Sequence, residues 1–463
     1  MIFLAIVIAG YMAWNIGAND VANAMGTSVG SKALTLRNAI IIAAVFEFLG
    51  AFFAGDAVTD TVRKGVLVIS EEDMATLSTE LYYGFIASML AAALWITLAT
   101  RYGLPVSTTH SIVGGIVGIG IFIDPDLIDY AKVGQIVISW IASPLLGGIL
   151  AYSTFYLIKK MILDTEDPIE RSRWMAPILA LPTFFVLSLA LQFKALKYIL
   201  PSSWLPSKDC AEGLSFMNSV ESCLPAQSLM AALVIALICS IILYVFLYNY
   251  EFEESGYQGV ETIFVWLQVI TACYVAFAHG ANDRSNAIGP MAAVWQVFKS
   301  GSLGETAEVP LWLVLLGSLG IVIGITTWGY RVMKTIGEKI THITPTRGFA
   351  AQFAAATTVL IFSMPFLAIP ISTTHTLVGS VVGVGLAGGA SSVDFRVFGK
   401  IAASWVASIP AAGIGSMVLY AIFGLNETRF IVTVLIIMAT IVWLVYNSIK
   451  SGPKVEIDVG NGA

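Results

Sequence analysis

Two aspartates, Asp20 and Asp283, lie within long apolar stretches, in the runs GANDVANAMG and GANDRSNAIG. An ionised Asp inside a membrane span costs about 2.5–3.5 kcal/mol on insertion scales, so such a residue is normally paired and functional. Gly supplies backbone freedom, and the adjacent Asn19 and Asn282 supply amide oxygens. We therefore predict that each run breaks its helix and presents oxygens to a hard cation, Na⁺ or a proton. The alternative is a helix cap at the membrane surface, which Asn and Asp also favour.

A second pair of runs, PVSTTH at Pro105–His110 and PISTTH at Pro370–His375, favours binding of an anion rather than a cation. Proline ends the preceding helix, and the hydroxyl residues open a new apolar helix whose N-terminus carries roughly half a positive charge. Hydroxyls and amides at such an end bind anions without a buried Lys or Arg. We predict that the two ends meet and surround a tetrahedral oxyanion, the alternative being ordinary Ser/Thr capping and packing. The candidate anion ligands are Ser107, Thr108, Thr109, Ser372, Thr373 and Thr374.

Glu47 stands alone in the apolar run from Ile40 to Ala54. A lone intramembrane Glu is a candidate for an additional cation or for a proton relay. The alternative is a Glu that snorkels or bonds to a hydroxyl. The second half has no acidic counterpart, and Gly317 or Ser318 fall nearby.

Four other polar residues accompany these motifs. His110 and His375 follow the hydroxyl runs without an HxxH or CxxC pattern, so we predict that they orient the site by bonding to backbone or carboxylate, with proton coupling as the alternative. Gln352 is a weaker polar candidate in an apolar run. Arg284 corresponds to Val21 in the first run and would either pair with an acid or reach the anion.

The composition requires a membrane to position these residues. The chain has 463 residues, of which 57% are hydrophobic and 12% charged, and its mean hydropathy is +0.84. A soluble domain is nearer half apolar and a quarter charged. The length allows roughly 11–13 membrane segments of about 20 residues. The net charge of -6 and the lack of a long basic run give no sign of nucleic-acid binding.

Thirteen apolar stretches form the expected all-α, polytopic framework. They lie near residues 1–30, 36–55, 80–101, 104–123, 132–158, 175–200, 226–248, 260–291, 310–330, 348–369, 370–388, 398–425 and 428–449. Two pairs, 80–123 and 348–388, have almost no polar loop between their members, so each is either two spans or one re-entrant hairpin. The distribution of Lys and Arg over the loops places the N-terminus outside the cell. The N-terminus lacks a basic n-region and is expected to be the first membrane helix rather than a removed leader.

The motifs repeat in one order at one spacing. Residues 17–26 recur at 280–289 with seven of ten identical, 105–120 recur at 370–385 with ten of sixteen identical, and 139–143 recur at 404–408. An odd number of spans precedes the second copy, so the copies are inverted in the membrane. Inverted repeats are typical of secondary transporters that bind substrate near the bilayer midplane. The predicted units are repeat 1 (1–160), connecting helices and loops (161–257), repeat 2 (258–449) and a polar tail (450–463).

The four cysteines are too scattered for a disulfide framework. Cys239 and Cys273 lie in apolar runs and are expected to be packing residues. Cys210 and Cys223 share one polar loop and would be able to pair if that loop is extracytoplasmic.

The paired GAND and PxSTTH motifs resemble the signature of the PiT family of inorganic phosphate transporters. The resemblance covers both halves and implies phosphate uptake by symport with Na⁺ or H⁺. It places functional weight on Asp20, Asn23, Asp283 and Asn286, of which Asn23 and Asn286 are assigned to phosphate, and it matches Glu47 to an important position. A second family Glu appears here as Gln352, which puts any role of its charge in doubt. The fuller run GANDVANAMGTSVGSKALTLR looks closer to the sodium-coupled branch.

The expected function is therefore import of phosphate with Na⁺ by a multi-pass protein of the cell membrane, without catalysis or a resident cofactor, as a monomer or a homo-oligomer. The predicted Na⁺ ligands are Asn19, Asp20, Asn282, Asp283 and Glu47. A dianion entering against 100 mV meets about 4.6 kcal/mol of opposition, so two or three Na⁺ are expected per phosphate. The alternatives are coupling to H⁺, transport of metal-phosphate, sulfate or another oxyanion, an ion channel, and an intramembrane enzyme; no HExxH or GxSxG motif favours the last.

Overall fold

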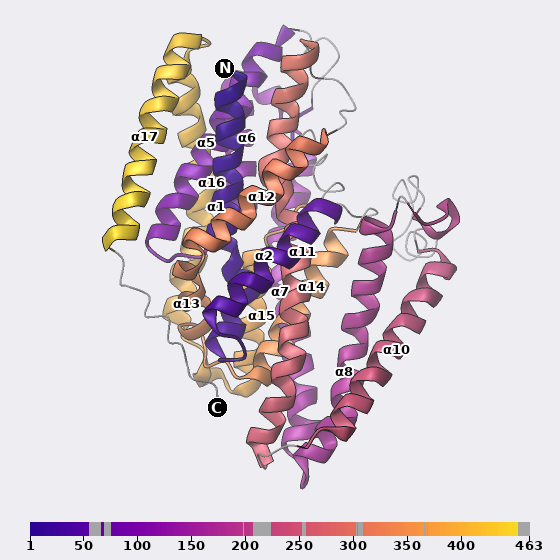
Figure 1. The fold of residues 1–463 in the computed structure, drawn as a ribbon. Helices are drawn as coiled ribbons and strands as arrows, with labels where there is room; N and C mark the ends of the chain where they lie inside the picture. Colours follow the sequence, from indigo (N-terminus) through magenta and orange to yellow (C-terminus); the bar gives the residue numbers. More distant parts are fainter. Residues whose placement is uncertain are drawn as a thin grey trace.

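The computed structural model describes residues 1–54, 66–68, 76–197, 199–206, 224–251, 256–301, 303, 309–364, 367 and 369–451. Within these ranges the chain is nearly all helical (Figure 1), and two isolated β-bridges join Leu67 to Ile128 and Thr341 to Val393. Ten of the described helices are long and apolar enough to cross a membrane. The protein is therefore a multi-pass membrane protein.

Each of the thirteen predicted apolar stretches contains one helix. The first half has α1 (Ile2–Gly30), α2 (Leu36–Ala54), α5 (Ser78–Arg101), α6 (Thr108–Ile123) and α7 (Tyr130–Ile158). The connecting region has α8 (Pro168–Ala190) and α10 (Ala226–Asn249). The second half has α11 (Gly256–Ser300), α12 (Leu311–Trp328), α13 (Tyr330–Glu338), α14 (Pro345–Phe362), α15 (Thr373–Gly388) and α16 (Phe395–Phe423), and α17 (Glu427–Ser451) follows. Short 3₁₀ or π turns occupy Pro125–Leu127, Lys159–Leu163, Leu191–Ala195, Ser202–Trp204 and Ala390–Ser392.

The two short-looped pairs are helical hairpins. In each hairpin the second helix, α6 or α15, has 16 residues. At 1.5 Å per residue it is about 24 Å long, which is short of the ~30 Å hydrocarbon core. Ser107 and Ser372 begin these helices, because each hydroxyl accepts the backbone N–H of the histidine three residues later at 3.1 Å. The predicted break before each hydroxyl run is confirmed.

The prediction that the GAND runs break their helices is wrong. Helix α1 continues through the first run and α11 through the second. Their leading glycines serve close packing instead. A Cβ on Gly17 would overlap the carbonyl oxygen of Ile321 in α12, and a Cβ on Gly280 would overlap that of Glu47 in α2. Small residues allow two helices to cross with their backbones in contact. The polar side chains of the runs bond to other segments while the helical backbone hydrogen bonds stay intact.

The halves are interleaved rather than side by side. Helix α15 packs on α7 of the first half, where Gly379 lies against Pro144 and Gly383 against Gly148. Helix α6 packs on α16 of the second half in the same manner. Helices α8 and α10 stand at one flank of the bundle (Figure 1). This exchange brings the starts of α6 and α15 to the centre of the molecule.

The cysteine predictions divide between described and undescribed residues. Cys239 and Cys273 are free and half-buried. Cys210 and Cys223, and the predicted tail from residue 452 onward, lie outside the described residues.

Candidate anion and cation sites at the hairpin tips

A buried polar cluster lies where α1 and α11 meet the starts of α6 and α15. Asp20 and Asp283 are both fully buried. The Thr108 hydroxyl donates to Asp20 Oδ2 at 2.7 Å, and the Thr373 hydroxyl donates to Asp283 Oδ2 at 2.8 Å. Each aspartate thus bonds to the first residue of the second hairpin helix, α6 or α15, in its own half.

The second asparagine of each run reaches across to the opposite half. Asn23 Nδ2 donates to the hydroxyl of Thr374 at 2.9 Å and to that of Thr373 at 3.3 Å. Asn286 Nδ2 donates to the hydroxyls of Thr109 at 3.1 Å and Thr108 at 3.2 Å. The hairpin threonines of both halves therefore meet at one place, as the repeat analysis predicted.

Two amide oxygens in this cluster have no hydrogen-bond partner. Asn23 Oδ1 and Asn286 Oδ1 are buried without one. A buried acceptor left unsatisfied costs about 1–3 kcal/mol. Both oxygens therefore need a positively charged or donor group as a partner. A bound cation, or a proton on a bound anion, would supply it.

Asn19 and Asn282 hold the hairpin connections. Asn19 Oδ1 accepts from the backbone N–H of Val106 at 3.1 Å, while its amide donates to Thr100 and Leu104. Asn282 Nδ2 donates to the Ile371 carbonyl at 3.1 Å. The side chains predicted as cation ligands are thus engaged with the extended segments that precede α6 and α15.

His279 is a central residue that the sequence analysis missed. Its Nδ1 lies 2.8 Å from Glu47 Oε2, and its Nε2 lies 2.8 Å from Asp283 Oδ2 and 3.7 Å from Asp20 Oδ2. All of these groups are buried. The ring therefore joins three carboxylates on α1, α2 and α11. A comparison of the two GAND runs carried the signal, because the residue before the first run is Ile16.

The cluster can hold a cation. Ligand atoms of Asp20, His279 and Asp283 lie within 4.8 Å of one another. With Glu47 added, three carboxyl groups share a single imidazole, so with all three ionised the cluster is anionic even when the ring is protonated. Buried, uncompensated carboxylates are strongly unfavourable, and hard oxygen ligands suit an alkali cation.

The counterpart of Glu47 is Ile321, and the expectation of Gly317 or Ser318 is corrected. Gly280 contacts the Glu47 carbonyl just as Gly17 contacts that of Ile321. The offset differs because the segment from α11 to α12 is longer than that from α1 to α2. The His279–Glu47 pair thus corresponds to two buried isoleucines, Ile16 and Ile321, at the equivalent positions of the other repeat.

Gln352 and Arg284 both bond across helix contacts. Gln352 Nε2 donates to the Ala24 carbonyl at 2.9 Å and the Ser28 hydroxyl at 2.8 Å, and its Oε1 accepts from Thr271 at 2.9 Å. It therefore ties α14 to α1 and α11. Arg284 Nη1 donates to the Ala51 carbonyl at 2.6 Å, in the last turn of α2.

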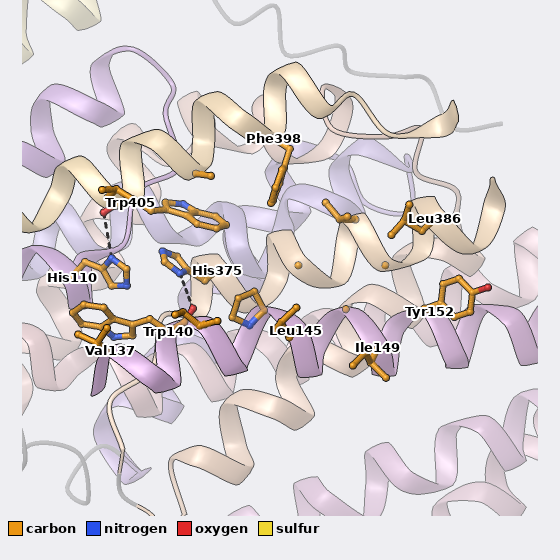
Figure 2. A pocket seen from close by; sticks show the side chains of 18 of the residues that line it. His110, Val137, Trp140, Leu145, Ile149, Tyr152, His375, Leu386, Phe398 and Trp405 are labelled. Carbon is orange, nitrogen blue, oxygen red and sulfur yellow. Dashed lines mark hydrogen bonds between the residues drawn. The ribbon is translucent and has the colours of Figure 1, made fainter. Parts of the chain in front are cut away.

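His110 and His375 bond to the backbone of the opposite half. His110 Nδ1 lies 3.4 Å from the Trp405 carbonyl, and His375 Nδ1 lies 3.3 Å from the Trp140 carbonyl. Of the two bonding partners predicted for them, backbone and carboxylate, the structure shows the backbone. The rings lie between the indoles of Trp140 and Trp405 (Figure 2).

Comparison with known proteins places the chain in a family. The model of the phosphate transporter family matches residues 16–416. A putative phosphate permease of Thermococcus kodakarensis is 44% identical over 423 residues, covering 91% of this chain and 97% of the relative. The chloroplastic inorganic phosphate transporter 2-1 of Arabidopsis thaliana is 40% identical over 422 residues, covering 86% of this chain and 68% of the relative. A solved structure described as the sodium-dependent phosphate transporter is 36% identical, with a TM-score of 0.80 over 92% of this chain and 99% of the other. The chain belongs to the phosphate transporter family.

Proposed function

We propose that this protein imports inorganic phosphate by symport with Na⁺. The observation that carries the proposal is the convergence of the α6 and α15 N-termini, whose threonines are bonded across the halves by Asn23 and Asn286. Hydroxyl donors and free N–H groups at two facing helix starts suit a tetrahedral oxyanion. The family and the sodium-dependent structural neighbour support both phosphate and Na⁺.

The proposed phosphate ligands are the hydroxyls and backbone N–H groups of Ser107–Thr109 and Ser372–Thr374, with the amides of Asn23 and Asn286. In the structure these hydroxyls are satisfied by protein groups, including the Thr109 bond to the Ile371 carbonyl at 3.2 Å and the Thr374 bond to the Val106 carbonyl at 3.2 Å. Phosphate binding would exchange such bonds for charge-assisted ones, which are stronger. The hairpin tips would separate slightly to admit the anion.

The proposed Na⁺ ligands are Asp20, Asp283 and Glu47, assisted by the unpartnered oxygens of Asn23 and Asn286. Asn19 and Asn282 act on the cation sites indirectly, by holding the segments that precede α6 and α15. Three carboxylates favour three Na⁺ per phosphate. Three positive charges exceed the charge of the dianion, so an inside-negative potential would drive uptake.

We place the protein in the cell membrane, with 1–160 and 258–449 as the inverted repeats and 161–257 as the connector. The repeats would rock against each other around the fixed central site, as in other inverted-repeat transporters. No catalytic step is involved, and Na⁺ serves as a co-transported ion.

Radioactive phosphate uptake into proteoliposomes tests this function. We expect accumulation with an inward Na⁺ gradient, none with K⁺ in its place, and little competition from sulfate. Asp20→Asn and Asp283→Asn should abolish accumulation, while Asp126→Asn, at an exposed position, should not change it. Accumulation driven by a proton gradient without Na⁺ would reject sodium coupling and retain the phosphate site.

A further inference from the structure

A membrane-facing cavity of about 710 Å³ lies between α7 and α16, with α15 as its floor. His110 and His375 lie at one end with the two tryptophans, and Tyr152 and Leu386 lie at the other (Figure 2). The wall residue Val406 is 72% exposed. Pockets of this volume hold small organic molecules. The cavity is therefore open to molecules dissolved in the bilayer.

The wall is apolar except at the histidine end and at Tyr152 at the opposite end. The four rings at the histidine end contact one another in series, with centroids 3.7 Å apart for His110 and Trp140, 4.2 Å for His110 and His375, and 3.7 Å for His375 and Trp405. The two histidines meet edge to face, and His375 stacks on Trp405. Three polar atoms of these rings are buried without a partner, namely His110 Nε2, His375 Nε2 and Trp140 Nε1. Unpaired buried polar groups are rare in proteins and require an explanation.

The hydrogen-bonding roles of these atoms follow from their neighbours. A backbone carbonyl only accepts, so Nδ1 of each histidine carries the hydrogen that it directs to Trp405 or Trp140. In a neutral imidazole the other nitrogen, Nε2, is then an acceptor. The indole Nε1 of Trp140 is a donor. A single hydroxyl satisfies both types, because it donates to an Nε2 and accepts from an N–H.

We propose that this cavity binds a neutral, membrane-dissolved amphiphile whose hydroxyl, carried on a flat or aromatic head, bonds to the histidine end. Its apolar body would extend along α7 toward Tyr152. A carboxylate or phosphate head is disfavoured, because ionised groups near the bilayer midplane are costly and the lining offers no cation. None of the proposed phosphate and Na⁺ ligands lines the cavity, although His110 and His375 directly follow Thr109 and Thr374 in the sequence. The proposal does not rest on the proposed transport function.

Binding of radiolabelled 4-nonylphenol to the purified full-length protein tests the proposal. Unlabelled 4-nonylphenol should compete at micromolar concentration. Its methyl ether has the same apolar body without the donor and should compete about tenfold more weakly, which is the effect of losing one hydrogen bond. Equal competition by the phenol and its ether would show only nonspecific hydrophobic binding and would overturn the proposal.

Two variants locate the site. Val406→Trp fills the cavity from its wall and should remove the competable binding, whereas Val418→Trp, on the same helix but outside the lining, should leave it unchanged. His375→Asn retains a donor near the Trp140 carbonyl but removes Nε2, and should weaken phenol binding without changing that of the ether. Thermal melting confirms that each variant is folded.

Binding unchanged by Val406→Trp would reject this location. The oligomeric state of the purified protein provides an independent outcome. If Val406→Trp dissociates an oligomer into single copies, a second copy of the chain covers this face and the amphiphile site is wrong.

Discussion

Glu47→Gln removes one carboxylate from the cation cluster with almost no change in shape. In the structure Glu47 is buried, and its Oε2 contacts His279 Nδ1 at 2.8 Å. The neutral amide cannot offset a bound Na⁺, and Asp20 and Asp283 remain as the only carboxylates of the cluster. We therefore expect the variant to carry one positive charge fewer per phosphate.

The magnitude follows from the membrane potential. One elementary charge moved across 100 mV is worth about 2.3 kcal/mol, which corresponds to roughly 50-fold in a concentration ratio. With equal Na⁺ on both sides and an inside-negative potential of about 100 mV, three Na⁺ per dianion should give the wild type about 50-fold phosphate accumulation. The variant, with two Na⁺ per dianion, should show none.

The assay uses proteoliposomes with a K⁺ diffusion potential set by valinomycin, and Glu338→Gln provides the matched control at an exposed position. The control should accumulate phosphate as the wild type does. Voltage-driven accumulation in Glu47→Gln equal to that in the wild type would refute the assignment of a cation to Glu47. A variant that fails under every gradient is distinguished by measuring tracer phosphate exchange at zero voltage.

Three further predictions concern phosphate affinity and packing. The double variant Asn23→Ala/Asn286→Ala loses the amides that bridge the hairpin threonines, so the phosphate concentration for half-maximal uptake should rise at least tenfold; an unchanged value would place phosphate elsewhere. Gly280→Ala would force a Cβ into the backbone of α2 and should lower the melting temperature by several degrees, whereas Gly134→Ala, with open space around it, should not; equal melting of the two would contradict the crossing. Gln352→Ala leaves buried partners on α1 and α11 unsatisfied and should destabilise the protein by about 2–3 kcal/mol in reversible unfolding, and a loss below 0.5 kcal/mol would show that the bridge is unimportant.

The hairpins and their caps were predictable from local chemistry. A proline followed by hydroxyl residues and a glycine-rich run is sufficient to end one helix and start another, and both Ser107 and Ser372 act as caps. The duplication then predicts that the two helix ends meet, because a repeated motif in inverted halves implies a shared site.

The helix continuity through the GAND runs was not predictable in the same way. Asn, Asp and Gly have low helix propensity, and the prediction assumed that the free-energy cost of placing them in a helix would interrupt it. In the structure Asp20 and Asn23 bond to hairpin hydroxyls, and Gly17 permits contact with α12. Tertiary partners that the local sequence does not specify therefore override propensity.

The role of His279 depends on a helix crossing. It precedes the second run by one residue, but its partner Glu47 lies on α2, and only the contact of Gly280 with the Glu47 backbone brings the two together. The equivalent crossing of Gly17 on the Ile321 backbone identifies Ile321 as the counterpart of Glu47. A count of residues along the chain gave the wrong position because the loops of the two halves differ in length.

The central claim is that phosphate binds between the tips of the two hairpins, and an electron cryomicroscopy map of the protein with phosphate and Na⁺ tests it most directly. The account predicts tetrahedral density within hydrogen-bond distance of Ser107–Thr109 and Ser372–Thr374, absent from a matched map recorded without phosphate. Density for phosphate at any other position, or an unchanged map at a phosphate concentration that saturates calorimetric binding, would contradict it.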